Sequence, residues 1–169
     1  MTDNNDIRRE VLACLEYQRS SVRSVVAGLD EDAWHKPVVP SGWNIAGMVE
    51  HIGGAEWHWF HAVVADKPLE LPADDEDLPP YDPETVVFFS DSPSSEVLAF
   101  YREVCDQSDE ILAGFGLSDA PRALHRHPGA GITSVHGVIL HVIEETAAHS
   151  GHLEIARELL DGATRRGLR

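Results

Sequence analysis

The sequence predicts an all-α protein, a four-helix bundle with one long crossover connection between its second and third helices. Four stretches carry apolar residues at intervals of three and four, the period of an amphipathic helix. A proline-rich acidic stretch, 67–91, separates the second of these stretches from the third, and no two stretches alternate like paired strands. Such an arrangement is typical of a bundle, and 169 residues suit a single domain over 1–169.

The first two helices are predicted from their apolar periods and their end signals. Apolar residues recur from Ile7 to Leu29, and the first helix is expected to end near Gly28. The second helix is expected to run from Asn44, a residue type that favours N-caps, to about Ala65. The Lys67-Pro68 pair then stops it, because the residue before a proline disfavours the helical conformation.

The connection after the second helix is strongly acidic. Between residues 67 and 91 a single lysine stands against eight acidic residues, a net charge of −7. Such a stretch can cover a site as a lid, but we favour a solvated crossover at the surface. The third helix is expected to follow from Ser92-Pro93, an N-cap and a first-turn proline, and to close at Gly114.

The overall charge excludes several classes of partner. Thirteen Lys and Arg residues against 29 Asp and Glu residues give a formal net charge of −16. So acidic a chain argues against binding to nucleic acid or to an anionic membrane surface. No apolar run is long enough to span a membrane, and the polar N-terminus is no signal peptide. Two cysteines without a CxxC pattern fit a reducing compartment, so we expect a cytoplasmic protein.

The fourth helix is predicted from Thr133 or Ser134 to Leu160, with Asp161-Gly162 as its exit. On a helical wheel His149 lies at the centre of the apolar stripe of this helix. The stripe is formed by five neighbours of His149: Val138, Val142, Leu153, Ala156 and Leu160.

Glu145 lies one turn before His149, inside the margin of the same apolar stripe. A carboxylate that faces a bundle core must be protonated, paired or bound to a metal. Residues four apart point the same way, so this carboxylate and this imidazole can hold one cation. The alternative is a structural hydrogen-bonded pair of Glu145 with His149, or with an arginine from another helix.

The second helix supplies one more inward histidine. His51 lies at the edge of an apolar flank, beside Gly47, Gly54 and Ala55, whose small side chains leave room for something else. A histidine from one helix and a Glu-x₃-His pair from another fit a three-ligand site with an open coordination position. Mixed nitrogen and oxygen ligands suit zinc, nickel, cobalt, iron or manganese, of which we expect zinc or nickel.

Two further histidines are candidates for catalytic roles. His152 follows His149 by three residues and is expected to be a fourth ligand, a support for a ligand, or a residue lining the site. His58 lies two turns from His51 and is expected at the mouth of the cavity. Either imidazole could shuttle a proton. His125 and His127, in a proline-rich loop, are expected at the surface.

Three stretches carry a family resemblance: Ser41-Gly42-Trp43-Asn44 leading into VEHIGGAEWHWF, then DSPSSEVLAFYREVCDQSDEIL, then HVIEETAAHSGHLEIARELLDG. They resemble the DinB-like superfamily and, within it, the DUF664 group, related to the metal-binding domains of mycothiol-dependent maleylpyruvate isomerases. The resemblance implies a DinB-type four-helix bundle and a divalent metal held by His51, Glu145 and His149. Many superfamily members have histidine at the position of Glu145, and the glutamate resembles the maleylpyruvate isomerase branch.

The resemblance also implies a class of activity. Superfamily members of known activity are mostly transferases or isomerases that use mycothiol, bacillithiol or glutathione. Our first hypothesis is therefore a metal-dependent transferase or isomerase that acts on a small molecule with a low-molecular-weight thiol such as mycothiol. The alternatives are a non-catalytic metal-binding or stress-related module and a metal-dependent hydrolase. A homodimer is also expected, because Trp57 and Phe60 are predicted to point off the inner side of the second helix.

Overall fold

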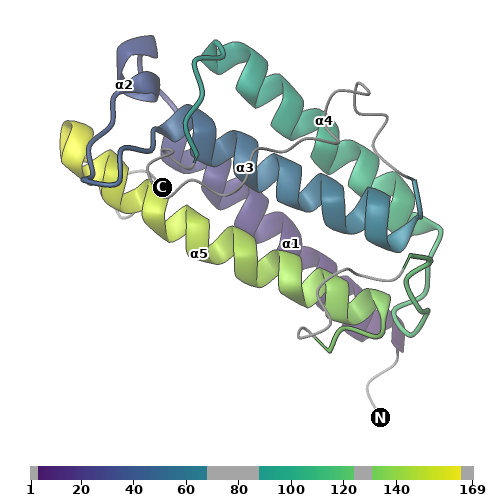
Figure 1. The fold of residues 1–169 in the computed structure, drawn as a ribbon. Helices are drawn as coiled ribbons and strands as arrows, with labels where there is room; N and C mark the ends of the chain where they lie inside the picture. Colours follow the sequence, from purple (N-terminus) through teal and green to yellow (C-terminus); the bar gives the residue numbers. More distant parts are fainter. Residues whose placement is uncertain (1–3, 68–87, 124–130, 165–169) are drawn as a thin grey trace.

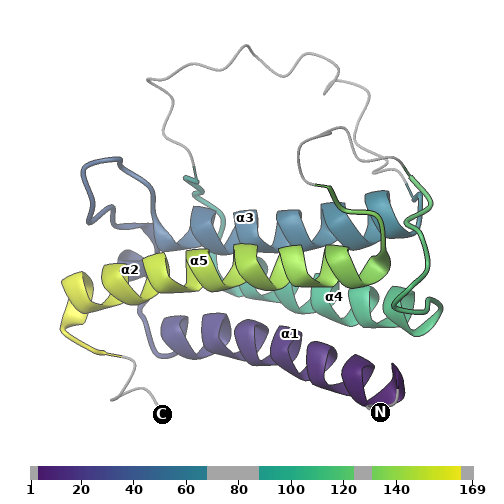
Figure 2. The ribbon, with the colours of Figure 1, turned by 90° about the horizontal axis from the view of Figure 1, so that it is seen from below.

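The computed structural model describes residues 4–67, 88–123 and 131–164, and the regular elements within these ranges are all helices. Four long helices, α1 (Asn4–Val26), α3 (Ile45–Trp57), α4 (Ser94–Ala113) and α5 (Val135–Asp161), lie side by side (Figures 1 and 2). Helix α5 packs against both α1 and α3, and α3 packs against α4. The predicted all-α bundle is confirmed.

The direction of the helices explains the long crossover. Helices α1 and α5 run one way along the bundle, while α3 and α4 run the opposite way (Figure 1). Because α3 and α4 are parallel, the end of α3 and the start of α4 lie at opposite ends of the bundle, and a long crossover must join them. Residues 68–87, which hold most of the acidic stretch, lie outside the described residues. The described end of this connection begins at Phe88.

Side-chain caps fix the ends of the two helices that carry the candidate site. The Asn44 side chain accepts a hydrogen bond from the backbone N–H of Gly47 at the start of α3. Ser134 caps α5 in the same way through the N–H of Gly137. Gly162, with a φ of +76°, ends α5 in the left-handed conformation that suits glycine. These three predicted ends are confirmed.

The predicted start of α4 is wrong by one residue. Pro93, rather than Ser92, is the N-cap, and Pro93 makes no side-chain capping bond. The capping group comes from elsewhere, since the backbone N–H of Ser94 donates to Oε1 of Glu31 at 2.8 Å and its hydroxyl donates to Oε2. The carboxylate of Glu31, which is distant in sequence, therefore caps the start of α4 in place of the Ser92 side chain.

Glu31 belongs to a short helix, α2 (Glu31–His35), which is not among the four predicted helices. Five residues are too few to show an apolar period. The ring of His35 contacts two carbonyl oxygens, Nδ1 that of Glu31 and Nε2 that of Ser92, each at 2.9 Å. Both are acceptors, so the doubly protonated imidazolium satisfies them best. The bond to Ser92 is the main reason why the pKa of His35 is raised above its ordinary value.

Helix α3 continues as a π-helix, η1 (His58–Val64). Its wider turns carry each residue through a smaller angle than an α-helix does, so side chains after His58 depart from the α-helical wheel. Phe60 is fully buried, and the prediction that it points off the inner side of the helix is wrong. Even at 100° per residue it lies only about 20° from Val49, which is also fully buried. Trp57 is half-buried, with its ring stacked on that of His61 at 5.0 Å. Phe60 therefore cannot contribute to the exposed helix face from which a homodimer was expected.

A buried ion pair crosses the apolar core. Arg19 of α1 is 1% exposed and Glu56 of α3 is 0% exposed. The Arg19 guanidinium donates to both Glu56 carboxylate oxygens, at 2.5 and 3.2 Å, and to Oδ1 of Asp109 at 2.8 Å. Burial alone would lower the pKa of Arg19, but the charge of Glu56 raises it above its ordinary value. Beside the pair, burial raises the pKa of the Cys105 thiol to about 12.

Candidate metal centre

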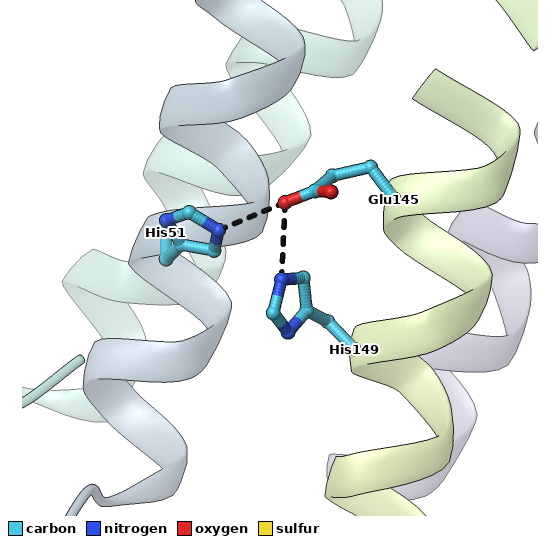
Figure 3. A group of neighbouring side chains, drawn as sticks. All are labelled: His51, Glu145 and His149. Atoms are coloured by element: carbon cyan, nitrogen blue, oxygen red, sulfur yellow. Dashed lines mark hydrogen bonds and ion pairs between the residues drawn. The ribbon is translucent and has the colours of Figure 1, made fainter. Parts of the chain in front are cut away.

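Three side chains from two helices converge between α3 and α5. His51 comes from α3, and Glu145 and His149 come from α5, with one carboxylate oxygen between the two imidazoles (Figure 3). Nε2 of His51 lies 3.1 Å and Nε2 of His149 lies 3.0 Å from Oε1 of Glu145. The three candidate ligand atoms all lie within 4.8 Å of one another. The structure thus brings together the three residues that the sequence singled out.

Local geometry and helix packing together produce this cluster. Glu145 and His149 are four residues apart on α5, so their side chains share one face. Helix α3 packs against that face and brings the His51 ring to a centroid distance of 4.8 Å from the His149 ring, nearly edge-on at 81°. The side chains are 31% exposed for His51, 31% for Glu145 and 14% for His149. The cluster is therefore half-buried and reachable from outside.

The charge of Glu145 suits a cation. Partial burial raises the pKa of this carboxyl group, but the hydrogen bonds from His51 and His149 and the charge of His149 outweigh burial and lower it overall. Glu145 is consequently ionised at neutral pH. An ionised carboxylate only accepts hydrogen bonds, so both imidazoles donate an Nε2–H to it here.

The spacing of the donor atoms fits a first-row divalent metal. Ligands at about 2.1 Å from a tetrahedral zinc lie about 3.4 Å apart. The two nitrogen–oxygen distances of 3.0 and 3.1 Å need to open by only a few tenths of an ångström to reach that value, while the two imidazole nitrogens, which lie within 4.8 Å of each other, need to draw closer. Two imidazoles and one carboxylate are also a donor set of catalytic zinc sites, in which a further position stays open for water or substrate. The residues present therefore fit a divalent cation.

His152 contacts this cluster without being one of its three convergent residues. Nδ1 of His152 lies 3.3 Å from Nδ1 of His149, the ring nitrogen that faces away from Glu145. The His152 side chain is exposed. Of the three roles considered for it, this contact favours support of the ligand His149.

His58 lies outside the cluster. It is the first residue of η1 and is exposed, with its ring 5.7 Å from that of Trp59. Seven residues separate it from His51, about 10 Å along a helix axis. His125 and His127 lie outside the described residues, so their predicted surface position stays a prediction.

Phe88, which no sequence pattern above singles out, also touches the cluster. The Phe88 ring lies 4.2 Å from the His51 ring and 5.5 Å from the His149 ring, measured between centroids. The signal that could have found it is the run Val86–Phe89, four apolar residues at the end of an otherwise acidic, proline-rich stretch. An apolar run in such a stretch indicates a segment that packs against the fold.

The fold and the cluster define an all-α bundle with a candidate mononuclear metal centre between two of its helices. A family model described as mycothiol-S-transferase matches residues 10–162. The chain belongs to this DinB-like family. No curated protein matches the chain. The DinB-like resemblance is thus confirmed, while assignment to DUF664 stays a prediction. Among the described residues, no helix is both long and apolar enough to cross a membrane.

Proposed function

We propose that this protein is a metal-dependent transferase or isomerase that uses a low-molecular-weight thiol of the mycothiol type on a small molecule. The observation that carries the proposal is the convergence of His51, Glu145 and His149 in a member of the mycothiol-S-transferase family. The family supports the thiol, and the donor set supports the metal. We also propose that it acts in the cytoplasm, which its two free cysteines support.

The three convergent side chains would hold a divalent cation, with zinc or nickel as our preferred ions. Such a cation supplies Lewis acidity that lowers the pKa of a thiol brought to it, so that the nucleophilic thiolate is available at neutral pH. Glu145 contributes a negative charge that the cation offsets, and the half-buried setting strengthens that attraction. One of its oxygens also accepts a hydrogen bond from each of the two imidazoles.

His152 is proposed to fix the tautomer of His149. If Nε2 of His149 is to bind a cation, its proton must move to Nδ1, which lies 3.3 Å from Nδ1 of His152. His152 can then accept that hydrogen bond, as the partners of metal-ligating histidines commonly do. Because its side chain is exposed, His152 can also pass a proton to solvent. His58 is exposed and lies about 10 Å from His51 along the helix axis. It is therefore proposed as a proton carrier only for a ligand long enough to reach from the metal centre to His58.

Calorimetry with mycothiol and with its S-methylated form tests the proposal. The zinc-loaded protein is titrated at pH 7 with each compound in buffers of different ionisation enthalpy. We expect mycothiol to bind with release of about one proton, because its thiol has a pKa near 8.5 in water and loses the proton at the site. The S-methyl compound carries no such proton and is expected to release none.

Two results would count against the thiol mechanism. The first is no heat with millimolar mycothiol, and the second is equal binding of both compounds without proton release. If metal binds but neither compound does, a screen of esters, amides and lactones tests the hydrolase alternative. A metal-loaded protein that is inert in that screen as well would be the non-catalytic module.

A further inference from the structure

We propose that Phe88 is a positioning residue of the candidate centre, held by the described end of the α3–α4 connection so that its ring keeps the His51 imidazole turned toward Glu145. The effect of Phe88 on metal binding rests on the proposed function, because it requires that His51, Glu145 and His149 hold a cation. The orientation of His51 can be measured without any metal.

His51 depends on packing for its orientation more than His149 does. The His149 ring is held at both nitrogens, Nε2 by Glu145 and Nδ1 by His152. In the part of the chain that the structure describes, the His51 ring has a hydrogen bond only at Nε2. A metal-ligating histidine usually has a partner on its other nitrogen as well. Here the face of the Phe88 ring, at 4.2 Å and tilted by 42°, restricts rotation of the imidazole instead.

Asn44 locks the returning chain in place. Its side-chain amide donates to the carbonyl oxygen of Ser90 at 2.8 Å, and its Oδ1 accepts from the N–H of Ser90 at 3.2 Å. Its own backbone N–H donates to the carbonyl oxygen of Phe88 at 3.3 Å. The residue that caps α3 thus also fixes the register of residues 88–90 against the start of that helix.

Gly47 lets the returning backbone come close enough. A Cβ atom at this position would lie 2.2 Å from the carbonyl carbon and oxygen of Phe88, a distance that no side chain tolerates. The room that Gly47 leaves one turn before His51 is therefore filled by the chain itself. Phe88 also has a φ of +63°, a conformation that an aromatic residue rarely adopts. Strained backbone that the surrounding bonds hold in place is characteristic of functional sites.

These observations change the interpretation of the acidic connection. Its described end is neither a solvated surface loop nor a detached cover, because residues 88–90 are bonded to α3 and Phe88 touches two residues of the cluster. Phe88 also packs against the apolar core, so a purely structural role must be distinguished from a positioning role.

The test compares zinc affinity, measured by competition with a chromophoric chelator, in wild type, Phe88→Ala, Phe88→Leu and Phe89→Ala. Phe89 is the matched control, since it is the neighbouring phenylalanine and is 46% exposed. We expect Phe88→Ala to weaken zinc binding by about tenfold or more, the range seen when a support of a ligand is removed. The zinc affinity of Phe88→Leu is expected to lie between those of wild type and Phe88→Ala. The zinc affinity of Phe89→Ala is expected to stay within about twofold of wild type, because Phe89 supports no ligand.

The second readout is the NMR spectrum of the histidine rings in the metal-free protein. Phe88→Ala should weaken the NOEs between the His51 ring protons and the Glu145 side chain, and more than it weakens those between His149 and Glu145. NOEs are compared because loss of the Phe88 ring current would by itself shift the His51 signals. Gly47→Ala keeps the aromatic ring of Phe88 but displaces residues 88–90, so it should also weaken zinc binding. This variant tests the proposal if Phe88→Ala does not fold. Wild-type NOEs between His51 and Glu145, together with wild-type zinc affinity, in a folded Phe88→Ala or Gly47→Ala variant would overturn the proposal. A wild-type protein that binds neither zinc nor nickel would refute the proposed function, while the NOEs between His51 and Glu145 would still decide the positioning role.

Discussion

Replacing Glu56 with glutamine is expected to destabilise the protein strongly, although the two side chains have nearly the same shape. The substitution removes the negative charge that faces the Arg19 guanidinium, which is 1% exposed and always protonated. Among the described residues, Arg19 then keeps two anionic partners, Asp109 at 2.8 Å and Glu16 at 3.7 Å, whose side chains are themselves more than half exposed.

The magnitude follows from this geometry. Removing one partner of a buried ion pair costs about 3–5 kcal/mol, and the remaining contacts of Arg19 favour the lower end, about 3 kcal/mol. At about 2–4 °C per kcal/mol for a chain of this size, the melting temperature should fall by about 6–12 °C. Thermal unfolding of the metal-free protein, followed by circular dichroism, measures the change.

One control variant and one double variant test whether the loss of stability comes from the uncompensated charge of Arg19. Glu50→Gln carries the same substitution on the same helix, at a carboxylate that enters no ion pair among the described residues, and should shift the midpoint by less than about 2 °C. Arg19→Met combined with Glu56→Leu should recover most of the loss, because an apolar pair leaves no buried charge uncompensated. A Glu56→Gln midpoint as close to wild type as that of Glu50→Gln would show that the buried pair is not what the core depends on.

Two further predictions concern the ends of helices. Ser134→Ala removes the N-cap of α5 and should lower the free energy of unfolding, measured by urea denaturation, by about 1 kcal/mol. Thr133→Ala, at the neighbouring residue, should leave the free energy of unfolding unchanged. The raised pKa of His35 means that its contribution to stability is complete below the unfolded value near 6.5 and is lost as the pH rises through the higher folded value. The melting temperature of wild type should therefore exceed that of His35→Gln by more at pH 6 than at pH 9, and an unchanged difference would refute the link between α2 and Ser92.

The sequence was sufficient for the four long helices because each repeats the apolar period over many residues and most of their ends carry a recognisable cap. It was also sufficient to single out His51, Glu145 and His149, since a carboxylate within an apolar stripe is conspicuous. The same reasoning would have found Glu56, which lies between Ile52 and Trp59 on the buried side of α3.

Other features lay outside what periodicity can indicate. Helix α2 has five residues, fewer than two turns, and only Trp34 is buried in it. The π-helix changes the angle between successive residues after Trp57, which a wheel drawn at a constant angle does not show. Phe88 reaches the cluster through a close approach of two backbone segments distant in sequence, which depends on the fold and not on a local pattern.

The most direct test of the central claim is the zinc stoichiometry of the purified protein, measured by elemental analysis after equilibration with zinc and gel filtration. The wild type should retain about one ion per chain, and His51→Ala, Glu145→Ala and His149→Ala should each lose it, because removal of one of three protein ligands leaves too few donors. His58→Ala is the matched control and should retain the ion. Full retention in all three cluster variants would contradict the account.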